Sequence, residues 1–348
     1  MAGSRALRVL KRIGIGLGGV VVLSVAFGAA YEQWARHSAA KDFPPRGQLV
    51  DIGGRKLHLD CRGSGSPTVI LESGVDPNGT LSWRPVHDSI ARITRTCAYD
   101  RAGIMWSDDK SGPHDGEGVA RDLHAMLEKA GIGGPLVLVG LSAGGPYAMT
   151  YTRLYGDDVK GIVFVDASHA DQGKKLPPPG RKAYVELPFV PRAMSALAWT
   201  GIWRLVPAQA APGEPPAEAG ARQAYMGHSI GGVIAEMDAL PAIWEQAGKL
   251  RNLGDRPVVV LTSTQPYPPE MLQGLGVTKA EGEGMQARWK ALHAEIASWS
   301  TRSRQELVPD AGHYIQNERP DVVVRAVDEV VKAVRADAVK APAAAPAT

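Results

Sequence analysis

One pentapeptide constrains this chain more than any other feature: Gly-Leu-Ser-Ala-Gly at residues 140–144. It follows the apolar run 135–139 and precedes residues 145–155, whose composition suits a helix. Between a strand and a helix, Ser142 must occupy a turn so sharp that its backbone is strained. The flanking glycines leave room for that turn, because a Cβ at either position would collide with the strand or the helix. The motif therefore predicts a sheet edge from which the Ser142 hydroxyl projects as a nucleophile.

A second copy of the same pattern occurs at residues 227–231, around Ser229. Residues 221–226 before it do not read as a buried strand, and only one strand-like run follows in the chain. The motif is informative only in its strand–turn–helix context. We therefore interpret Ser229 as an ordinary polar residue near the start of a helix.

Composition indicates a globular chain. Of 348 residues, 44% are hydrophobic and 22% are charged, which excludes a disordered protein. The formal net charge of the chain is +3. Four cations near the N-terminus, Arg5, Arg8, Lys11 and Arg12, exceed this value, so the rest of the chain is close to neutral. Nucleic-acid binding needs a basic patch on the folded domain, and we expect no such partner.

Those cations precede an uncharged apolar stretch of 18 residues, 13–30, near the lower length limit for a membrane-spanning helix. A basic flank favours a cytoplasmic N-terminus and export of the chain beyond the stretch. We therefore expect a membrane anchor with the catalytic domain outside the cytoplasm. A cleaved signal peptide is the alternative, since residues 26–28 (Ala-Phe-Gly) resemble a cleavage site, and the protein would then be secreted. A buried core helix fits poorly, because the stretch has no polar face.

The rest of the chain alternates short β-branched runs with amphipathic segments, which is typical of a mostly parallel sheet with helices on both faces. Strands are predicted at 48–52, 55–61, 68–71, 95–99, 135–139, 161–165, 257–261 and 305–308, the first two forming a hairpin through Gly53-Gly54. Helices are predicted at 118–130, 145–155 and 320–334.

The strand signal disappears from residue 168 to 252, a segment rich in proline that we expect to be a helical cap. The predicted organisation is therefore an N-terminal anchor or signal segment with its linker (1–46, the linker being 31–46), a core (47–166 and 253–335), a cap (167–252) and a disordered tail (336–348). Within the cap, residues 207–220 are of low complexity and suggest a mobile loop.

A serine needs a base, a group that orients the base, and donors for the developing oxyanion. His313 follows the last strand and precedes the last helix, which suits the chain order nucleophile, acid, histidine. The acid is Asp166, at the end of strand 161–165, or Glu270. Glu270 is the first carboxylate after strand 257–261, where the acid more usually lies, and its distance from that strand favours Asp166.

Two backbone N–H groups are predicted to form the oxyanion hole. One belongs to Ala143, directly after the nucleophile, and the other to Val75, in the loop after strand 68–71. Glu72 and Ser73 in that loop either tune the donors or only hydrogen-bond the turn.

Residues 47–335 resemble the α/β-hydrolase fold superfamily, in its capped, esterase-like branch. Four motifs carry the resemblance: Ser73-Gly74, where many members have His-Gly, residues 99–103 (Tyr-Asp-Arg-Ala-Gly), residues 140–145, and Gly312-His313. The resemblance implies an eight-stranded, mostly parallel sheet with the cap inserted after the sixth strand. Some members, dehalogenases among them, place the acid after that strand, which supports Asp166. Dehalogenases and epoxide hydrolases of this fold use an Asp nucleophile, and Ser142 argues against both chemistries.

The chain has two cysteines, Cys61 and Cys97. The family's strand order makes their strands neighbours, so in an exported domain the resemblance implies a disulfide, with two buried thiols as the alternative. Neither cysteine has a ligand at metal-site spacing, and we expect neither a metal nor an organic cofactor.

These residues predict the hydrolysis of a carboxylic ester through a Ser-His-Asp triad. Tryptophans of the cap, Trp199, Trp203 and Trp244, suggest a small, apolar ester substrate, although they equally suit packing of the cap. A peptidase or amidase of the proline iminopeptidase type is one alternative. It would need an acidic pocket in the cap for a substrate amine, and the acids present there, Glu214, Glu218 and Glu236, show no decisive pattern. A non-catalytic binding protein of the same fold is the other.

Overall fold

The computed structural model describes residues 2–180, 189–207, 210 and 213–340. The chain divides into two compact units, one of residues 1–45 with 187–231 and one of residues 46–186 with 232–348. The second unit contains the sheet and all the residues predicted to form the active site.

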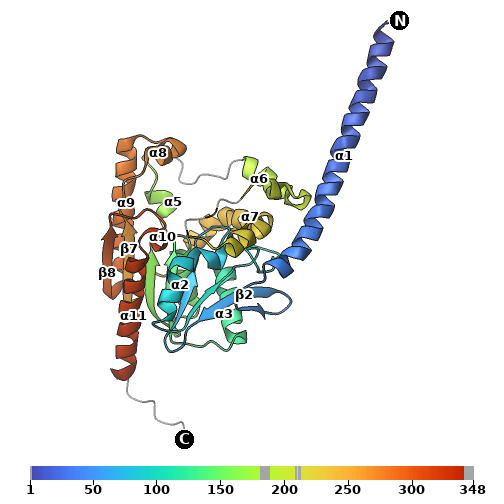
Figure 1. The fold of residues 1–348 in the computed structure, drawn as a ribbon. Coiled ribbons are helices and arrows are strands. Elements are labelled where there is room, and N and C mark those ends of the chain that lie inside the picture. The colour runs from blue at the N-terminus through green and yellow to red at the C-terminus, as the bar shows by residue number, and fades with distance from the viewer. Residues whose placement is uncertain (1, 181–188, 208–209, 211–212, 341–348) are drawn as a thin grey trace. The chain divides into compact units, whose positions relative to one another are not determined.

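An eight-stranded sheet organises this second unit (Figure 1). The strand order is β1-β2-β4-β3-β5-β6-β7-β8; β2 pairs antiparallel with β1 and β4, and every other neighbouring pair is parallel. The strands are β1 (Gln48–Asp51), β2 (Lys56–Arg62), β3 (Thr68–Glu72), β4 (Thr96–Tyr99), β5 (Leu136–Leu141), β6 (Val159–Val165), β7 (Gly254–Ser263) and β8 (Ser300–Val308). The predicted fold class, including the hairpin between β1 and β2, is confirmed.

Alternate residues of the central strands pack against helices on opposite faces of the sheet. In β3, Val69 and Leu71 join one hydrophobic core and Ile70 joins the other, as the two-residue period of a strand requires. The first core is closed by α2 (Arg84–Ala91) and α11 (Pro320–Lys340), and the second by α3 (Gly116–Lys129), α4 (Gly144–Leu154) and α9 (Lys279–Ala297). Every residue of β5 is buried, which suits a central parallel strand and gives the turn after it a rigid base.

Between β6 and β7 the described residues contain helices and no strand. These helices are α5 (Gln172–Lys175), α6 (Phe189–Ala196), the 3₁₀ turns η2 (Ala198–Thr200) and η3 (Ile202–Leu205), and α7 (Pro216–Ala247). The boundaries of the predicted cap stay a prediction. The predicted loop 207–220 is wrong at its end, because α7 already begins at Pro216, a favourable first-turn residue; residues 208–209 and 211–212 lie outside the described part.

Three short elements complete the second unit: η1 (Gly79–Trp83), α8 (Pro269–Leu275) and α10 (Ile315–Glu318). The C-terminal helix is longer than predicted, because α11 continues to Lys340. Residues 336–340 are therefore helical rather than part of a tail, and residues 341–348 lie outside the described part.

In the first unit, α1 (Ala2–Asp42) is one continuous helix, the long blue helix of Figure 1. The predicted linker over residues 31–46 is therefore wrong up to Asp42. A helical ion pair four residues apart, from Arg36 to Glu32 at 2.7 Å, supports this part of α1. Glu32 also accepts a 2.6 Å hydrogen bond from Arg204.

From Leu7 on, α1 is long and apolar enough to cross a membrane, a property that a signal sequence near the N-terminus shares.

A disulfide joins the antiparallel strands β2 and β4. Cys61 lies opposite Cys97 in the register of the two strands, and their sulfur atoms are bonded. The pairing that the family resemblance implied is therefore present in the structure.

Candidate active site

Ser142 occupies the turn between β5 and α4. Its φ is +50°, in the left-handed region that a residue with a Cβ rarely adopts. Among the described residues that are not glycine, only Met105, Ser142 and Asp166 have positive φ. Such strain costs on the order of 1–3 kcal/mol per residue and persists where the surrounding structure over-determines it. Two of the three strained residues are thus members of the predicted triad.

The glycines of the motif allow neighbouring backbone to approach the turn. A Cβ on Gly140 would lie 2.6 Å from the carbonyl oxygen of Gly144. A Cβ on Gly144 would overlap the carbonyl oxygen of Glu72, at the end of β3. Both obstacles are main-chain atoms, so a larger residue at either position would have to displace the turn or the adjoining loop.

Asp166 leaves the sheet beside Ser142. The strands β5 and β6 pair in parallel with Leu141 opposite Val165, so the next residue of each strand emerges at the same edge. Ser142 N–H donates to the carbonyl of Val165 at 3.3 Å, and Ser168 N–H donates to the carbonyl of Ser142 at 2.8 Å. These bonds tie the two turns together at the carboxyl ends of the strands.

His313 contacts Asp166 from the loop between β8 and α10. Its Nδ1 lies 2.7 Å from Asp166 Oδ2, and its ring is 38% exposed whereas Asp166 is buried. With Nδ1–H donating to the carboxylate, Nε2 of the neutral ring is the nitrogen left with a lone pair. Glu270, the alternative acid, is exposed in the first turn of α8. The structure therefore pairs His313 with Asp166.

No hydrogen bond joins Ser142 Oγ to His313 within the part of the chain that the structure describes. Catalytic hydrogen bonds are often long in the absence of substrate and shorten when it binds. The arrangement thus brings acid and histidine together and places the serine beside the acid at the same sheet edge.

Both predicted oxyanion donors lie next to Ser142. Ala143 immediately precedes the first residue of α4, and the Val75 loop follows β3, which pairs with β5. In the described chain neither N–H enters a backbone hydrogen bond. A Cβ on Gly74 would lie 3.1 Å from Ser142 Cβ, so this loop approaches the serine directly. Ser73 Oγ donates to the carbonyl of Gly79 at 2.9 Å and thereby holds the loop.

Four residues around the site have contacts that sequence reasoning missed. Trp289 Nε1 donates to Asp166 Oδ1 at 2.8 Å, and the N–H of Ser263 donates to the same oxygen at 2.9 Å. Arg101 and Glu236 form a buried pair beside the Val75 loop. Arg101 belonged to the motif at 99–103 that carried the family resemblance, and Glu236 was weighed only as a substrate-binding acid. Trp289 offered no local signal, because 123 positions separate it from Asp166.

Ser229 does not lie on a sharp strand-to-helix turn like the one at Ser142, which we call the elbow. It is fully buried in the interior of α7 rather than near the start of a helix, which corrects the sequence interpretation. A helix interior cannot supply the strained strand-to-helix turn that the chemistry needs. Of the two matching pentapeptides, only the one around Ser142 adopts that geometry.

Comparison with known proteins agrees with this architecture. The alpha/beta hydrolase family matches residues 21–326. The chain belongs to this family. A thermophilic esterase from Thermogutta terrifontis has the same fold, with a TM-score of 0.53 and 22% identity over 82% of this chain and 97% of the esterase. The enol-lactonase of Burkholderia xenovorans LB400 superposes with a TM-score of 0.57 and 17% identity over 82% of this chain and all of that chain.

One relative by sequence is an uncharacterized protein of Schizosaccharomyces pombe, 32% identical over 151 residues. That match covers 35% of this alpha/beta hydrolase and only 28% of the yeast protein. A haloalkane dehalogenase of Sphingobium indicum is 30% identical over 132 residues, which cover 37% of this chain and 44% of the dehalogenase.

A cluster in this alpha/beta hydrolase has the residue types of a metal site, but an arginine already neutralises its carboxylates. His169, Asp171 and Glu295 bring their ligand atoms within 4.8 Å of one another. Arg251 donates to both carboxylates, at 2.9 Å to Asp171 and 2.8 Å to Glu295. His169 Nδ1 already accepts the N–H of Asp171 at 2.9 Å, so the lone pair of the neutral ring is occupied. The donor set therefore fits an ion-pair network better than a metal.

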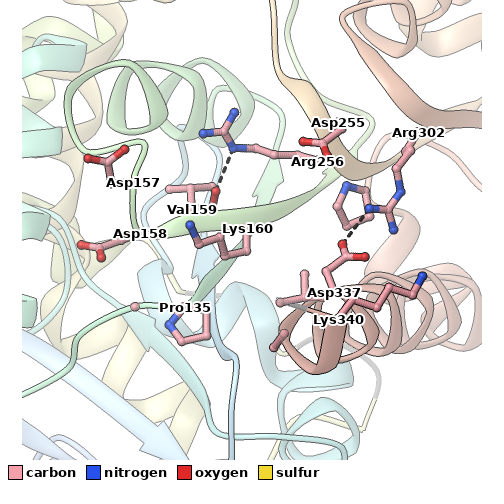
Figure 2. A pocket seen from close by; sticks show the side chains of 14 residues that line it. Pro135, Asp157, Asp158, Val159, Lys160, Asp255, Arg256, Arg302, Asp337 and Lys340 are labelled. Atoms are coloured by element: carbon pink, nitrogen blue, oxygen red, sulfur yellow. Dashed lines mark hydrogen bonds and ion pairs between the residues drawn. The ribbon is translucent and has the colours of Figure 1, made fainter. Parts of the chain in front are cut away.

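A separate pocket of about 730 Å³ opens at the other edge of the hydrolase sheet (Figure 2). Its lining includes Pro135, Val159 and Asp255, which lie at the amino ends of β5, β6 and β7. Arg302 there pairs with Asp337 at 2.6 Å. Parallel α/β sheets bind ligands at the carboxyl ends of their strands, where Ser142 and Asp166 lie. We therefore do not take this pocket as the active site.

Proposed function

We propose that this alpha/beta hydrolase cleaves carboxylic esters through an acyl-enzyme formed on Ser142. The observation that supports this most directly is the 2.7 Å contact of His313 Nδ1 with Asp166, beside a serine whose φ is +50°. A structural aspartate would not need strained backbone, a buried carboxylate and a half-exposed histidine at one sheet edge. Together they are the parts that an activated serine requires.

The proposed reaction has two halves. His313 Nε2 takes the Ser142 proton as Oγ attacks the ester carbonyl, and the N–H groups of Val75 and Ala143 stabilise the tetrahedral oxyanion. Such a donor is worth about 3 kcal/mol in the transition state. His313 then gives its proton to the leaving alcohol, and water attacks the acyl-enzyme by the same route to release the acid. Asp166 holds the imidazole in the correct tautomer and stabilises its cation.

The ion pairs disfavour the peptidase alternative. Recognition of a substrate amine would need an acid free of internal partners. Glu236 binds Arg101 with both oxygens, at 2.7 Å each, and Glu214 binds Arg222 with both oxygens, at 2.7 Å each. Two of the three acids considered for that role are thus already neutralised by arginine, which favours an ester substrate.

The test is labelling with a fluorophosphonate probe, which forms a covalent bond only with an activated serine. We expect the wild-type protein to label and Ser142→Ala to remain unlabelled. Ser229→Ala is the matched control, since it alters the other copy of the pentapeptide and should label like the wild type. Absence of labelling in a folded wild-type protein would support the binding-protein alternative instead.

Substrate class is a second measurement. The proposal expects turnover of aryl and alkyl esters, with apolar acyl chains preferred, and little turnover of aminoacyl amides. The apolar preference rests on the cap tryptophans. Trp203 packs against Gly227 in the first unit and Trp244 against Gly173 in the second, so both also have a packing role. An acyl-chain-length series of p-nitrophenyl esters separates these roles: a flat response would remove the apolar preference.

We also propose that residues 13–30 anchor the protein in a membrane with the catalytic domain outside the cytoplasm. The cations at residues 5–12 support this orientation. The Cys61–Cys97 disulfide supports it independently, because such bonds persist in oxidising compartments.

A further inference from the structure

Arg101 uses every N–H of a buried guanidinium. Nε and Nη2 donate to the two carboxylate oxygens of Glu236, and Nη1 donates to Glu72 Oε1, at 2.7 Å each. The two remaining hydrogens go to main-chain carbonyls, Nη1 to Ser73 at 2.8 Å and Nη2 to Gly74 at 2.7 Å. A guanidinium has five N–H donors, and here all five have an acceptor. The side chain therefore has a single orientation.

The carbonyl of Gly74 belongs to the same peptide unit as the N–H of Val75. A peptide unit is planar, and in its trans form the C=O and N–H point in opposite directions. Fixing the Gly74 oxygen on the guanidinium therefore fixes the direction in which the Val75 N–H points. Hydrogen bonds in series also polarise one another, so a cation on the oxygen makes the N–H a stronger donor.

The position of Arg101 is itself set by α7. A Cβ on Gly232 would lie 2.5 Å from the carbonyl of Gly103, so the helix packs tightly on the chain just after Arg101. Glu236 lies four residues further along, on the same helix face. Burial alone would lower the pKa of Arg101, but the carboxylates of Glu236 and Glu72 hold it well above its usual range. The guanidinium is thus charged at any pH at which the protein functions.

From these contacts we propose that Arg101 is a positioning residue for the oxyanion hole. It orients and polarises the Val75 N–H through the Gly74–Val75 peptide, and Glu236 holds Arg101 in place from α7. This inference rests on the proposed ester hydrolysis.

The test compares an ester with the thionoester that has sulfur in place of the carbonyl oxygen. Sulfur accepts hydrogen bonds poorly, so oxyanion donors accelerate the oxygen ester much more than the thionoester. We expect Arg101→Lys, which keeps the charge but loses the fork of donors, to lower kcat for the oxygen ester by roughly 10- to 100-fold, less than outright removal of a donor. KM should change less than about threefold, since the loss concerns the transition state. The preference for oxygen over sulfur should fall by the same factor as kcat.

Tyr99→Phe is the matched control. The Tyr99 hydroxyl donates to Glu72 within the same buried network but bonds neither loop carbonyl. Its removal should weaken the network and leave the preference for oxygen over sulfur as in the wild type. Glu236→Gln is the second test variant, for use if Arg101→Lys does not fold. It keeps the shape of the side chain, and we expect a smaller fall of kcat with the same direction of change in preference.

The outcomes separate the two proposals. A folded Arg101→Lys or Glu236→Gln enzyme that keeps the wild-type preference between the two esters would overturn the role of Arg101. A wild-type protein that hydrolyses neither ester would instead contradict the proposed function.

Discussion

The carboxylate of Asp166 accepts a 2.7 Å hydrogen bond from His313 Nδ1, although the two residues are 147 positions apart in the chain. We expect Asp166→Asn to lower kcat for an aryl ester by about 10⁴-fold, because an amide at this position favours the wrong tautomer of the ring. Glu270→Gln, which changes the exposed acid of α8, should retain wild-type activity. Initial rates on a p-nitrophenyl ester measure both variants. A fall of less than tenfold for Asp166→Asn would remove Asp166 from the triad.

Trp289 holds the other oxygen of that carboxylate. Trp289→Phe removes the 2.8 Å hydrogen bond to Asp166 Oδ1 but keeps an aromatic ring at the position. A hydrogen bond to a charged group contributes about 1.5–3 kcal/mol, so we expect kcat to fall roughly tenfold or more. Trp299 is a mostly buried tryptophan in the core, and Trp299→Phe is therefore a control for general loss of packing. Equal effects of the two substitutions on kcat would argue against a specific role for Trp289.

Gly144 tests the close approach of the Glu72 loop to the elbow. Gly144→Ala places a Cβ against the carbonyl of Glu72, which is main chain and cannot rotate away. Overpacking of this kind typically costs about 1–3 kcal/mol, and it also displaces the loop that carries Val75. We expect a lower urea midpoint together with a large loss of ester turnover. Gly133→Ala, where a Cβ would have no neighbour within 4 Å, should change neither.

The pKa shifts of His169 and Glu295 predict that the folded protein is less stable in acid. Burial lowers the pKa of His169 from 6.5 to about 4, so between these values the unfolded chain binds a proton that the folded chain does not. The free energy of unfolding therefore falls as the pH is lowered from 6.5 to 4. The pKa of Glu295 is also lowered, because the hydrogen bond from Lys175 and its other cationic neighbours outweigh burial, and its contribution is likewise lost in acid.

His169→Gln removes this titration, and the unfolding free energy of the variant should fall less steeply over that range. His37→Gln, at an exposed position of α1, should follow the wild-type curve. Urea unfolding at several pH values between 6.5 and 4 provides the comparison. Parallel curves for His169→Gln and the wild type would contradict the prediction.

The membrane assignment is tested at Val22, in the middle of the apolar stretch 13–30. An arginine at the centre of a spanning helix costs about 2.5–3.5 kcal/mol on insertion, so Val22→Arg should shift the protein out of the carbonate-resistant membrane fraction. Ser38→Arg, beyond the stretch, should not. The intact mass of the mature protein decides between anchor and signal peptide, since a chain that begins at Ala29 would show cleavage after residues 26–28.

Much of the architecture could be predicted because its signals are local. The two-residue alternation in β3, the glycine pair between β1 and β2, and the strand–turn–helix context of Ser142 each depend on residues close in the chain. Local sequence signals predicted the wrong structure at residues 31–42, where helical propensity and tertiary contacts both act. Residues 31–42 look like a linker, yet the Glu32–Arg36 pair and a contact from Arg204 accompany a continued helix there.

The sequence by itself determined the sheet, the elbow at Ser142 and the position of His313 after the last strand. Each of these depends on hydrophobic periodicity, turn residues or chain order, which can be read from residues that are close together in the chain. Only the tertiary structure decided that His313 contacts Asp166 rather than Glu270. It also decided that Arg101 donates a hydrogen bond to the carbonyl of Gly74, in the peptide unit that carries the Val75 N–H. Those contacts depend on strand register and helix packing, which bring together atoms that are distant in the chain. No local pattern records which of several carboxylates will face a given ring once the sheet has formed.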